Sequence, residues 1–217
     1  MPIPTSTRAP ARQLIRDLVF TQLRAAIVSG EMRPEEVVNE AEVEQWAGAS
    51  RTPVREALDK LSSIGLVVVE PQKATRVAPL DPAHAEQAFS VLSEGVIGHL
   101  SLTVTHLSAT QRRTLVRRVS AVRRATDIVG ADGLFDTIVA VAGNPRLRQL
   151  WNDVAPHVQR TWTLLPESAP SVEELDREAL VAAITAASPA AAEGALRAWI
   201  DAVDPLAPRV RSDRGGR

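Results

Sequence analysis

The sequence predicts a mainly α-helical protein with one small β-hairpin in its N-terminal third and an all-α, antiparallel six-helix bundle after it. Three observations support this fold class. Apolar residues recur at helical spacing over 12–29 and 51–64. Two short strand-like runs, 66–70 and 75–78, flank a turn. Beyond residue 82, no alternation typical of strands is found, and the pattern is helical throughout.

Composition limits the class of protein before any motif is considered. The chain has 217 residues, of which 45% are apolar, and it carries a formal net charge of -1 and no cysteine. The absence of cysteine excludes disulfides, thiolate metal sites and cysteine nucleophiles. No apolar run approaches the roughly 18–20 residues of a membrane span, and the first residues lack an apolar signal segment. We therefore expect a cytoplasmic protein with no membrane partner.

The first helix is predicted over residues 12–29, after a disordered start at 1–11. Gly30 ends this helix, and a short second helix follows at about 40–47 with Val43 facing inward. The apolar positions of the first helix are Leu14, Leu18, Val19, Leu23 and Ile27.

A third helix follows the turn at 48–50, in the sequence SRTPVREALDKLSSIGL. Ser50 or Thr52 can cap this helix, and Pro53 is tolerated so close to its start. Arg51, Thr52 and Arg55 fall on one flank of the helix, beside the apolar stripe. The stripe consists of Val54, Ala57, Leu58, Leu61 and Ile64. Arginine can pair bidentately with guanine or contact phosphates, so this helix suits the major groove of DNA; by itself it could equally be a solvated surface helix.

The hairpin completes a recognisable arrangement. Residues 66–70 and 75–78 are predicted as strands around the turn at 71–74, so that the order is helix, helix, turn, helix, hairpin. This order is typical of a winged helix-turn-helix DNA-binding domain, here at 12–78. Because the net charge gives no global basic field, any affinity for DNA must come from the local gathering of basic residues after residue 50.

The segment 79–82 is the predicted linker to the second domain, which we place at 83–205. Asp81 can cap the first helix of this domain, with Pro82 in its first turn. A polar and flexible tail is expected at 206–217. The six helices are predicted at about 82–107, 110–128, 131–142, 145–165, 172–187 and 189–203.

These motifs resemble a known family. The run SRTPVREAL, followed by Leu61, the tripeptide Gly65-Leu66-Val67 and a short wing, is similar to the GntR family of bacterial transcription regulators over roughly 12–78. The helical second domain resembles the FCD effector domain of the FadR subfamily, and six helices rather than seven favour its VanR-like branch. The resemblance implies a homodimer on double-stranded, pseudo-palindromic operator DNA. It also implies a small-molecule effector, commonly a carboxylate, and often a divalent metal.

Family positions that touch DNA can be carried over one by one. Arg51 and Arg55 match the arginines that read bases and phosphates, and the wing residues match positions near the minor groove. Ala41 and Ala74 depart from the family's usual arginine and glycine. The implied DNA-binding residues are Ser50, Arg51, Thr52, Arg55, Lys73 and Arg76.

The family's metal site does not carry over. Its ligands are an Asp, a His one turn later and two further His, but no imidazole occupies the matching positions. These positions are Ala131 or Asp132, Phe135 or Asp136, Arg177, and Trp199. We therefore predict no transition metal and no cofactor, although two aspartates could hold a hard cation weakly.

The predicted effector pocket leaves alternatives open. Arg177 could clamp a carboxylate directly, or it could be a surface residue paired with Asp176 or Glu173. Phe135 and Trp199 would make the cavity apolar, which suits a hydrophobic metabolite, or they would fill the core entirely. The candidate residues are Ser90, Glu94, Asp132, Phe135, Asp136, Arg177 and Trp199.

The function predicted from these observations is a sequence-specific, homodimeric DNA-binding regulator, most often a repressor, that responds to a metabolite without a transition metal. The alternative is an effector-blind DNA-binding protein whose bundle only dimerises. An enzyme is disfavoured because the sequence has no cysteine, no metal triad, no Ser-His pairing signature and no glycine-rich phosphate loop.

Overall fold

A computed structural model describes residues 9–69 and 74–203 of the chain, with the side chains of the first helix described from residue 15 onward. The chain divides into two compact units, residues 1–80 and 81–217, and the division falls within the predicted linker. The first helix begins at Ala9, so residues 9–11 are helical where the sequence analysis expected disorder. Residues 206–217, expected to form a flexible tail, lie outside the described residues.

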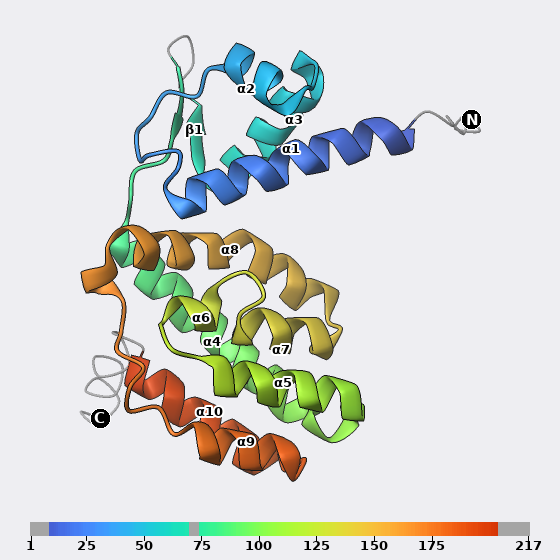
Figure 1. Ribbon diagram of the computed structural model, residues 1–217, viewed down its shortest axis with the longest axis vertical. Coiled ribbons are helices and arrows are strands. Elements are labelled where there is room, and N and C mark those ends of the chain that lie inside the picture. Colours follow the sequence, from blue (N-terminus) through green and yellow to red (C-terminus); the bar gives the residue numbers. More distant parts are fainter. Residues whose placement is uncertain (1–8, 70–73, 204–217) are drawn as a thin grey trace, which may run out of the picture. The chain divides into compact units, whose positions relative to one another are not determined.

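The first unit is a winged helix-turn-helix, as expected (Figure 1). Helices α1 and α3 pack against each other, and the buried side chains of both helices and of β1 and β2 form one core. The two strands are antiparallel, with Val67 opposite Val77 and Val69 opposite Thr75. The elements are α1 (Ala9–Ser29), α2 (Glu40–Ala47), α3 (Arg51–Ser63), β1 (Val67–Val69) and β2 (Thr75–Val77).

A short extended segment before α2 also pairs with the hairpin, which the sequence pattern did not indicate. The backbone N–H of Val38 donates to the carbonyl of Thr75 at 2.8 Å, and that of Val77 donates to the carbonyl of Glu36 at 2.9 Å. The segment therefore lies along the free edge of β2. This pairing fixes the start of α2 relative to the hairpin.

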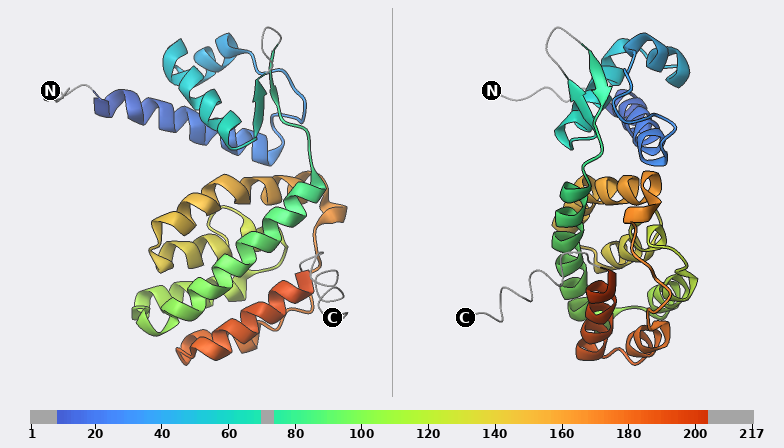
Figure 2. Two further views of the ribbon diagram at one scale, coloured as in Figure 1. Left: turned by 180° about the vertical axis from the view of Figure 1, so that it is seen from behind. Right: turned by 90° about the vertical axis from the view of Figure 1, so that its left-hand side faces the viewer.

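The second unit is helical throughout its described part, with α4 as its central element (Figures 1 and 2). Helix α4 packs against α7, α8 and α10, while α5 packs against α7 and α9. The elements are α4 (Pro82–Thr103), η1 (Val104–His106), α5 (Ala109–Ala121), α6 (Thr126–Val129), α7 (Leu134–Ala142), α8 (Pro145–Leu164), η2 (Pro166–Ser168), α9 (Arg177–Thr185) and α10 (Pro189–Val203).

The helix predicted at 110–128 is two helices, so the described part of this unit has seven α-helices instead of six. The chain turns extended at Val122, and the side chain of Asp127 accepts hydrogen bonds from the backbone N–H groups of Arg123 and Arg124, at 2.8 and 2.9 Å. These hydrogen bonds satisfy two backbone donors just beyond the end of α5, where a continuous helix would bond them to its own carbonyls. The helices predicted from 131 and 172 likewise begin later, at Leu134 and Arg177.

Helix α4 corrects one expectation about membranes. By length and composition, the span Pro82–His106 is long and apolar enough to cross a bilayer, although no such segment was expected. Its inward side chains, among them Phe89, Leu92 and Val96, are fully buried in the core of the unit. The core helix of a soluble protein meets the same test, so this span is weak evidence for a membrane segment.

Candidate nucleic-acid interface

The predicted reading residues lie together at the start of α3. The core side of this helix buries Val54, Ala57, Leu58 and Leu61, which fixes the direction of its opposite flank. Ser50, Arg51, Thr52 and Arg55 are all exposed. Ser50 is the N-cap residue by its extended backbone, but in the described part of the chain its side chain makes no capping hydrogen bond. Its hydroxyl is therefore free to meet a ligand.

A carboxylate from the preceding helix lies between the two arginines. The Nε atom of Arg55 donates to Oε2 of Glu40 at 3.1 Å and to Oε1 at 3.4 Å. The Nε atom of Arg51 is 3.5 Å from the same Oε2. The sequence analysis missed this contact, because it grouped the acidic residues before position 50 apart from the basic residues after it. The only available signal was that Glu40 opens a helix whose partner in the helix-turn-helix is α3.

The wing residues are only partly described. Arg76 is exposed on β2, and its Nη1 atom donates to the backbone carbonyl of Glu35 at 3.1 Å. Glu35 itself has a positive φ of 65°, a conformation that is uncommon for a residue other than glycine. Lys73, the other predicted wing contact, lies outside the described residues.

The seven predicted effector residues of the helical unit do not line one common cavity. Phe135 and Trp199 are buried in the core, and Trp199 also donates its indole N–H to the carbonyl of Asp176 at 2.9 Å. Asp132 is exposed and Ser90 half-buried on α4. These four side chains therefore serve packing, local bonding or solvent contact.

The two remaining carboxylates are held by arginines. Asp136 accepts from Nη1 of Arg148 at 2.6 Å. Glu94 forms a bidentate pair with Arg197, at 2.9 and 3.2 Å, and this hydrogen bond raises the pKa of Arg197. Glu94 is exposed, so the pair lies on the surface of the unit.

Arg177 is bound to backbone carbonyls and not to Asp176 or Glu173, the partners considered for it. Its Nε, Nη1 and Nη2 atoms donate to the carbonyls of Val122, Leu175 and Val172, at 3.1, 3.2 and 2.8 Å. Arg123 donates to the same carbonyl of Val122 at 2.9 Å. Two guanidinium groups thus meet at one oxygen, and among the described residues neither has a carboxylate partner within ion-pair distance.

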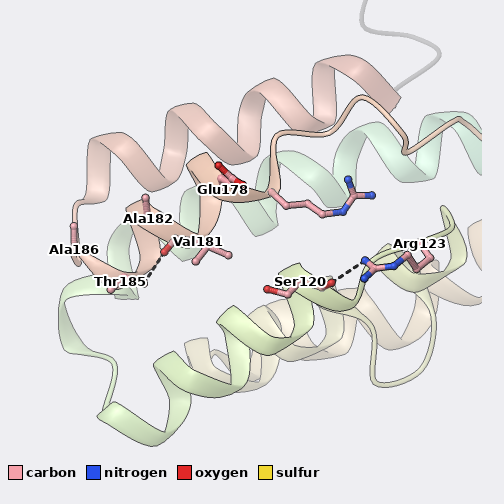
Figure 3. Close-up of a pocket in the computed structure, with 8 residues that line it drawn as sticks. Ser120, Arg123, Glu178, Val181, Ala182, Thr185 and Ala186 are labelled. Carbon is pink, nitrogen blue, oxygen red and sulfur yellow. Dashed lines mark hydrogen bonds between the residues drawn. The ribbon is translucent and has the colours of Figure 1, made fainter.

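These two arginines line a groove of about 630 Å³ between α5 and α9. Ser120 and Arg123 lie on one side of the groove, opposite Val181 and Thr185 of α9 (Figure 3). The groove therefore combines two guanidinium groups and an apolar wall with one carboxylate, that of Glu178. It was not predicted, because it depends on the break between α5 and α6.

The residues present do not fit the divalent metal that the family resemblance implies. Aromatic rings occupy two of the matching positions, Phe135 and Trp199, and a guanidinium group occupies a third, Arg177. In the residues that the structure describes, no group of three or more metal-ligating side chains is found. A phenyl ring has no donor atom for a metal ion, and the indole N–H of Trp199 is bonded to a carbonyl. A guanidinium group is itself a cation and does not ligate a metal ion.

A winged helix with a pair of exposed arginines at the start of its third helix, joined to an all-helical domain, defines a DNA-binding transcription regulator. The family described as "Bacterial regulatory proteins, gntR family" matches residues 15–77, and the FCD domain matches residues 99–202. Together the two matches span most of the chain, and the protein belongs to the GntR family of regulators with a C-terminal FCD domain. It is not an enzyme.

Individual relatives match this chain over most of its length. The chain is 28% identical over 199 residues to a probable D-xylose utilization operon transcriptional repressor of Paenarthrobacter nicotinovorans, covering 87% of this chain and 88% of the relative. It is also 28% identical over 204 residues to an HTH-type regulator of Streptomyces ambofaciens, covering 89% and 85% of the two chains.

Among solved structures, E. coli McbR/YncC has a TM-score of 0.65 at 19% identity, covering 93% of this chain and 99% of that one. A putative GntR regulator of Rhodococcus sp. RHA1 has a TM-score of 0.64 at 16% identity, covering 93% and 98%. At these identities the likeness establishes a shared fold.

Proposed function

We propose that this protein is a homodimeric, sequence-specific repressor that binds a pseudo-palindromic operator in the bacterial cytoplasm. The observation that carries the proposal is the exposed pair Arg51 and Arg55 at the start of α3, on a helix whose other face is fixed in the core. Ser50 and Thr52 would contact the DNA backbone beside them, and Arg76 with Lys73 would approach the adjacent groove from the wing. The repressor assignment draws on the D-xylose operon relative, whose printed name describes a probable repressor.

Dimerisation is proposed to use the outer face of α4. Val91 and Leu102 are 62% and 71% exposed, and their spacing of eleven residues puts them on one face of the helix. Exposed apolar side chains of this size, on the face of α4 opposite its buried one, favour a protein partner. A second copy of the chain supplies the two-fold symmetry that a palindromic site requires. The seven α-helices in the described part of this unit do not support the VanR-like branch, whose assignment rests on a count of six.

Selection of bound duplexes from a random pool tests the operator and the dimer together. The wild-type protein should enrich an inverted repeat whose half-sites lie about one helical turn apart or a multiple of it. Leu102→Asp should shift the protein to a monomer in sedimentation velocity and enrich single half-sites, because a charge opposes burial of this face. Leu150→Asp, an exposed leucine on α8, is the matched control and should behave like the wild type. Enrichment of random sequence by the wild type would refute the proposal.

An effector is proposed to bind in the groove between α5 and α9, without a transition metal. The guanidinium groups of Arg123 and Arg177 suit a carboxylate, and Val181 with Ala182 suits an aliphatic chain. This arrangement meets both chemical classes that the sequence suggested, a carboxylate and a hydrophobic metabolite. The alternative, an effector-blind protein whose bundle only dimerises, is favoured by the filled core around Phe135 and Trp199.

Thermal unfolding with octanoate and with octanol separates these two alternatives. We expect octanoate to raise the unfolding midpoint in proportion to ln(1 + [L]/Kd), and uncharged octanol to raise it less. Arg123→Met should reduce the difference between the two ligands, since it removes one of the two guanidinium groups and keeps a side chain of similar length. If neither ligand shifts the midpoint of the wild-type protein, the effector-blind alternative is the better description.

A further inference from the structure

Glu40 contacts both arginines that are proposed to bind DNA, so its carboxylate can affect how they bind. Among the described residues, this carboxylate is the one in contact with both Arg51 and Arg55, and it comes from a different helix, fifteen positions before Arg55 in the sequence. All three side chains lie on the surface proposed to meet DNA. A negative group at this place is unexpected, since it repels phosphates.

Glu40 is held firmly in place. It is the first residue of α2, directly after the N-cap Asn39, whose side-chain oxygen accepts from the backbone N–H of Ala41 at 3.0 Å. The side-chain amide Nδ2 of Asn39 also donates to Oε1 of Glu42 at 2.9 Å. The partial positive charge at the N-terminus of a helix stabilises a carboxylate in this position. Only 28% of the Glu40 side chain is exposed, against 67% for Arg51 and 58% for Arg55, so its carboxylate is the more enclosed member of the cluster.

The geometry leaves the outer ends of both arginines free. Each arginine meets Glu40 through its Nε atom. Among the described residues, no hydrogen bond is made by the terminal Nη atoms of Arg51 or Arg55. A guanine edge needs two N–H groups from one guanidinium fork, and with Nε engaged the available pair is the end-on pair of Nη atoms. The carboxylate thus supports the conformation that presents this pair.

The charge has a second consequence. One carboxylate between two guanidinium groups leaves a net charge of one on the cluster instead of two. Non-specific affinity for DNA comes from cations that neutralise phosphates, so this offset weakens non-specific binding in particular. Base recognition depends on geometry and is not reduced in the same way.

We propose that Glu40 is a positioning residue that sets the ratio of specific to non-specific DNA binding. It holds Arg51 and Arg55 with their outer nitrogens directed toward base edges, and it offsets half of their combined charge. This inference rests on the proposed function, in which the two arginines contact operator DNA. This role differs from simple competition between Glu40 and DNA for the arginines. In simple competition, the carboxylate would lower the affinity for every DNA sequence by the same factor.

The test compares full-length variants on two duplexes of equal length, the selected operator and a random sequence, between 50 and 200 mM salt. Glu40→Gln should bind random DNA more tightly, with a log–log salt slope steeper by about one, because one more cation is free for a phosphate. The operator-to-random affinity ratio should fall on the order of tenfold, which is the discrimination of one good bidentate contact. Glu40→Asp keeps the charge but is one methylene shorter, so its ratio should fall while its slope stays that of the wild type.

Glu42→Gln is the matched control, since it removes the same charge two residues later in the same helix and keeps an acceptor for Asn39. It should leave the ratio and the slope unchanged. Equal unfolding midpoints for all variants exclude a loss of fold. If Glu40→Gln strengthens binding to both duplexes by the same factor, Glu40 only competes with DNA and the inference is wrong. If the wild type does not distinguish the two duplexes, the proposed function itself fails and this inference fails with it.

Discussion

Replacing Arg55 with alanine is expected to weaken operator binding by about 1–3 kcal/mol, or roughly 5- to 150-fold, and to relax one base preference in each half-site. The arginine is exposed on α3, so its removal leaves the core of the winged domain intact, and alanine is a good helix former. Its Nε atom is engaged by Glu40, so the substitution also frees that carboxylate to repel DNA. The measurement is a mobility-shift titration of the operator and of single-base operator variants.

Arg33→Ala is the control for this experiment. Arg33 is exposed in the same unit and its removal changes the net charge equally, but it lies outside the helix-turn-helix. A general electrostatic effect would weaken binding similarly in both variants, with no change in sequence preference. A role in base reading requires that only Arg55→Ala changes the preferred sequence. Unchanged affinity and preference in Arg55→Ala would show that this arginine does not read the operator.

Local sequence patterns were sufficient where one short segment decides its own structure. The stripe Val54, Ala57, Leu58 and Leu61 fixes the orientation of α3, and β1 and β2 pair as antiparallel strands within the segments predicted as strands. The exposure of Arg51, Thr52 and Arg55 on one flank of α3 therefore followed from spacing alone.

Sequence patterns failed where a side chain acts on a distant or competing backbone. Residues 110–128 have helical composition, but Asp127 binds the backbone N–H groups of two preceding residues and interrupts the helix. Arg177 was a candidate for binding an anion or a surface carboxylate, yet it donates to three backbone carbonyls, two from the segment before α9 and one from Val122. Glu40 is near Arg55 only because α2 packs against α3. Periodicity does not encode which of several acceptors a long side chain will reach.

Replacing Phe135 with alanine is expected to lower the free energy of unfolding of the helical unit by about 3–5 kcal/mol, the usual loss when a fully buried phenylalanine is truncated. Phe135 is completely buried. Its ring stacks on Phe89 at 6.1 Å with an interplanar angle of 2°, and it lies 6.1 Å from the ring of Trp151. Urea unfolding followed by tryptophan fluorescence measures the change.

A Trp46→Phe background restricts that fluorescence signal to the helical unit, because the other three tryptophans, Trp151, Trp162 and Trp199, all belong to it. Protein concentration must be held constant, since a dimer gains stability from association. Phe135→Leu should cost much less than Phe135→Ala, because it restores most of the lost apolar volume.

The loss of unfolding free energy in Phe135→Ala shows whether an effector can bind in the interior of the helical domain. Phe135 lies at the position where the family resemblance places a metal ligand. A loss of several kcal/mol means that Phe135 fills a close-packed core, because an aromatic cluster around an empty pocket would have little packing to lose. Any effector must then bind elsewhere, and the groove bounded by Arg123 and Arg177 is the place proposed for it. A loss below about 1 kcal/mol would instead indicate that the site can collapse or hold a ligand in the ring's place. The interior around Phe135 would then be the better candidate for the effector site, and the groove between α5 and α9 would no longer be favoured over it.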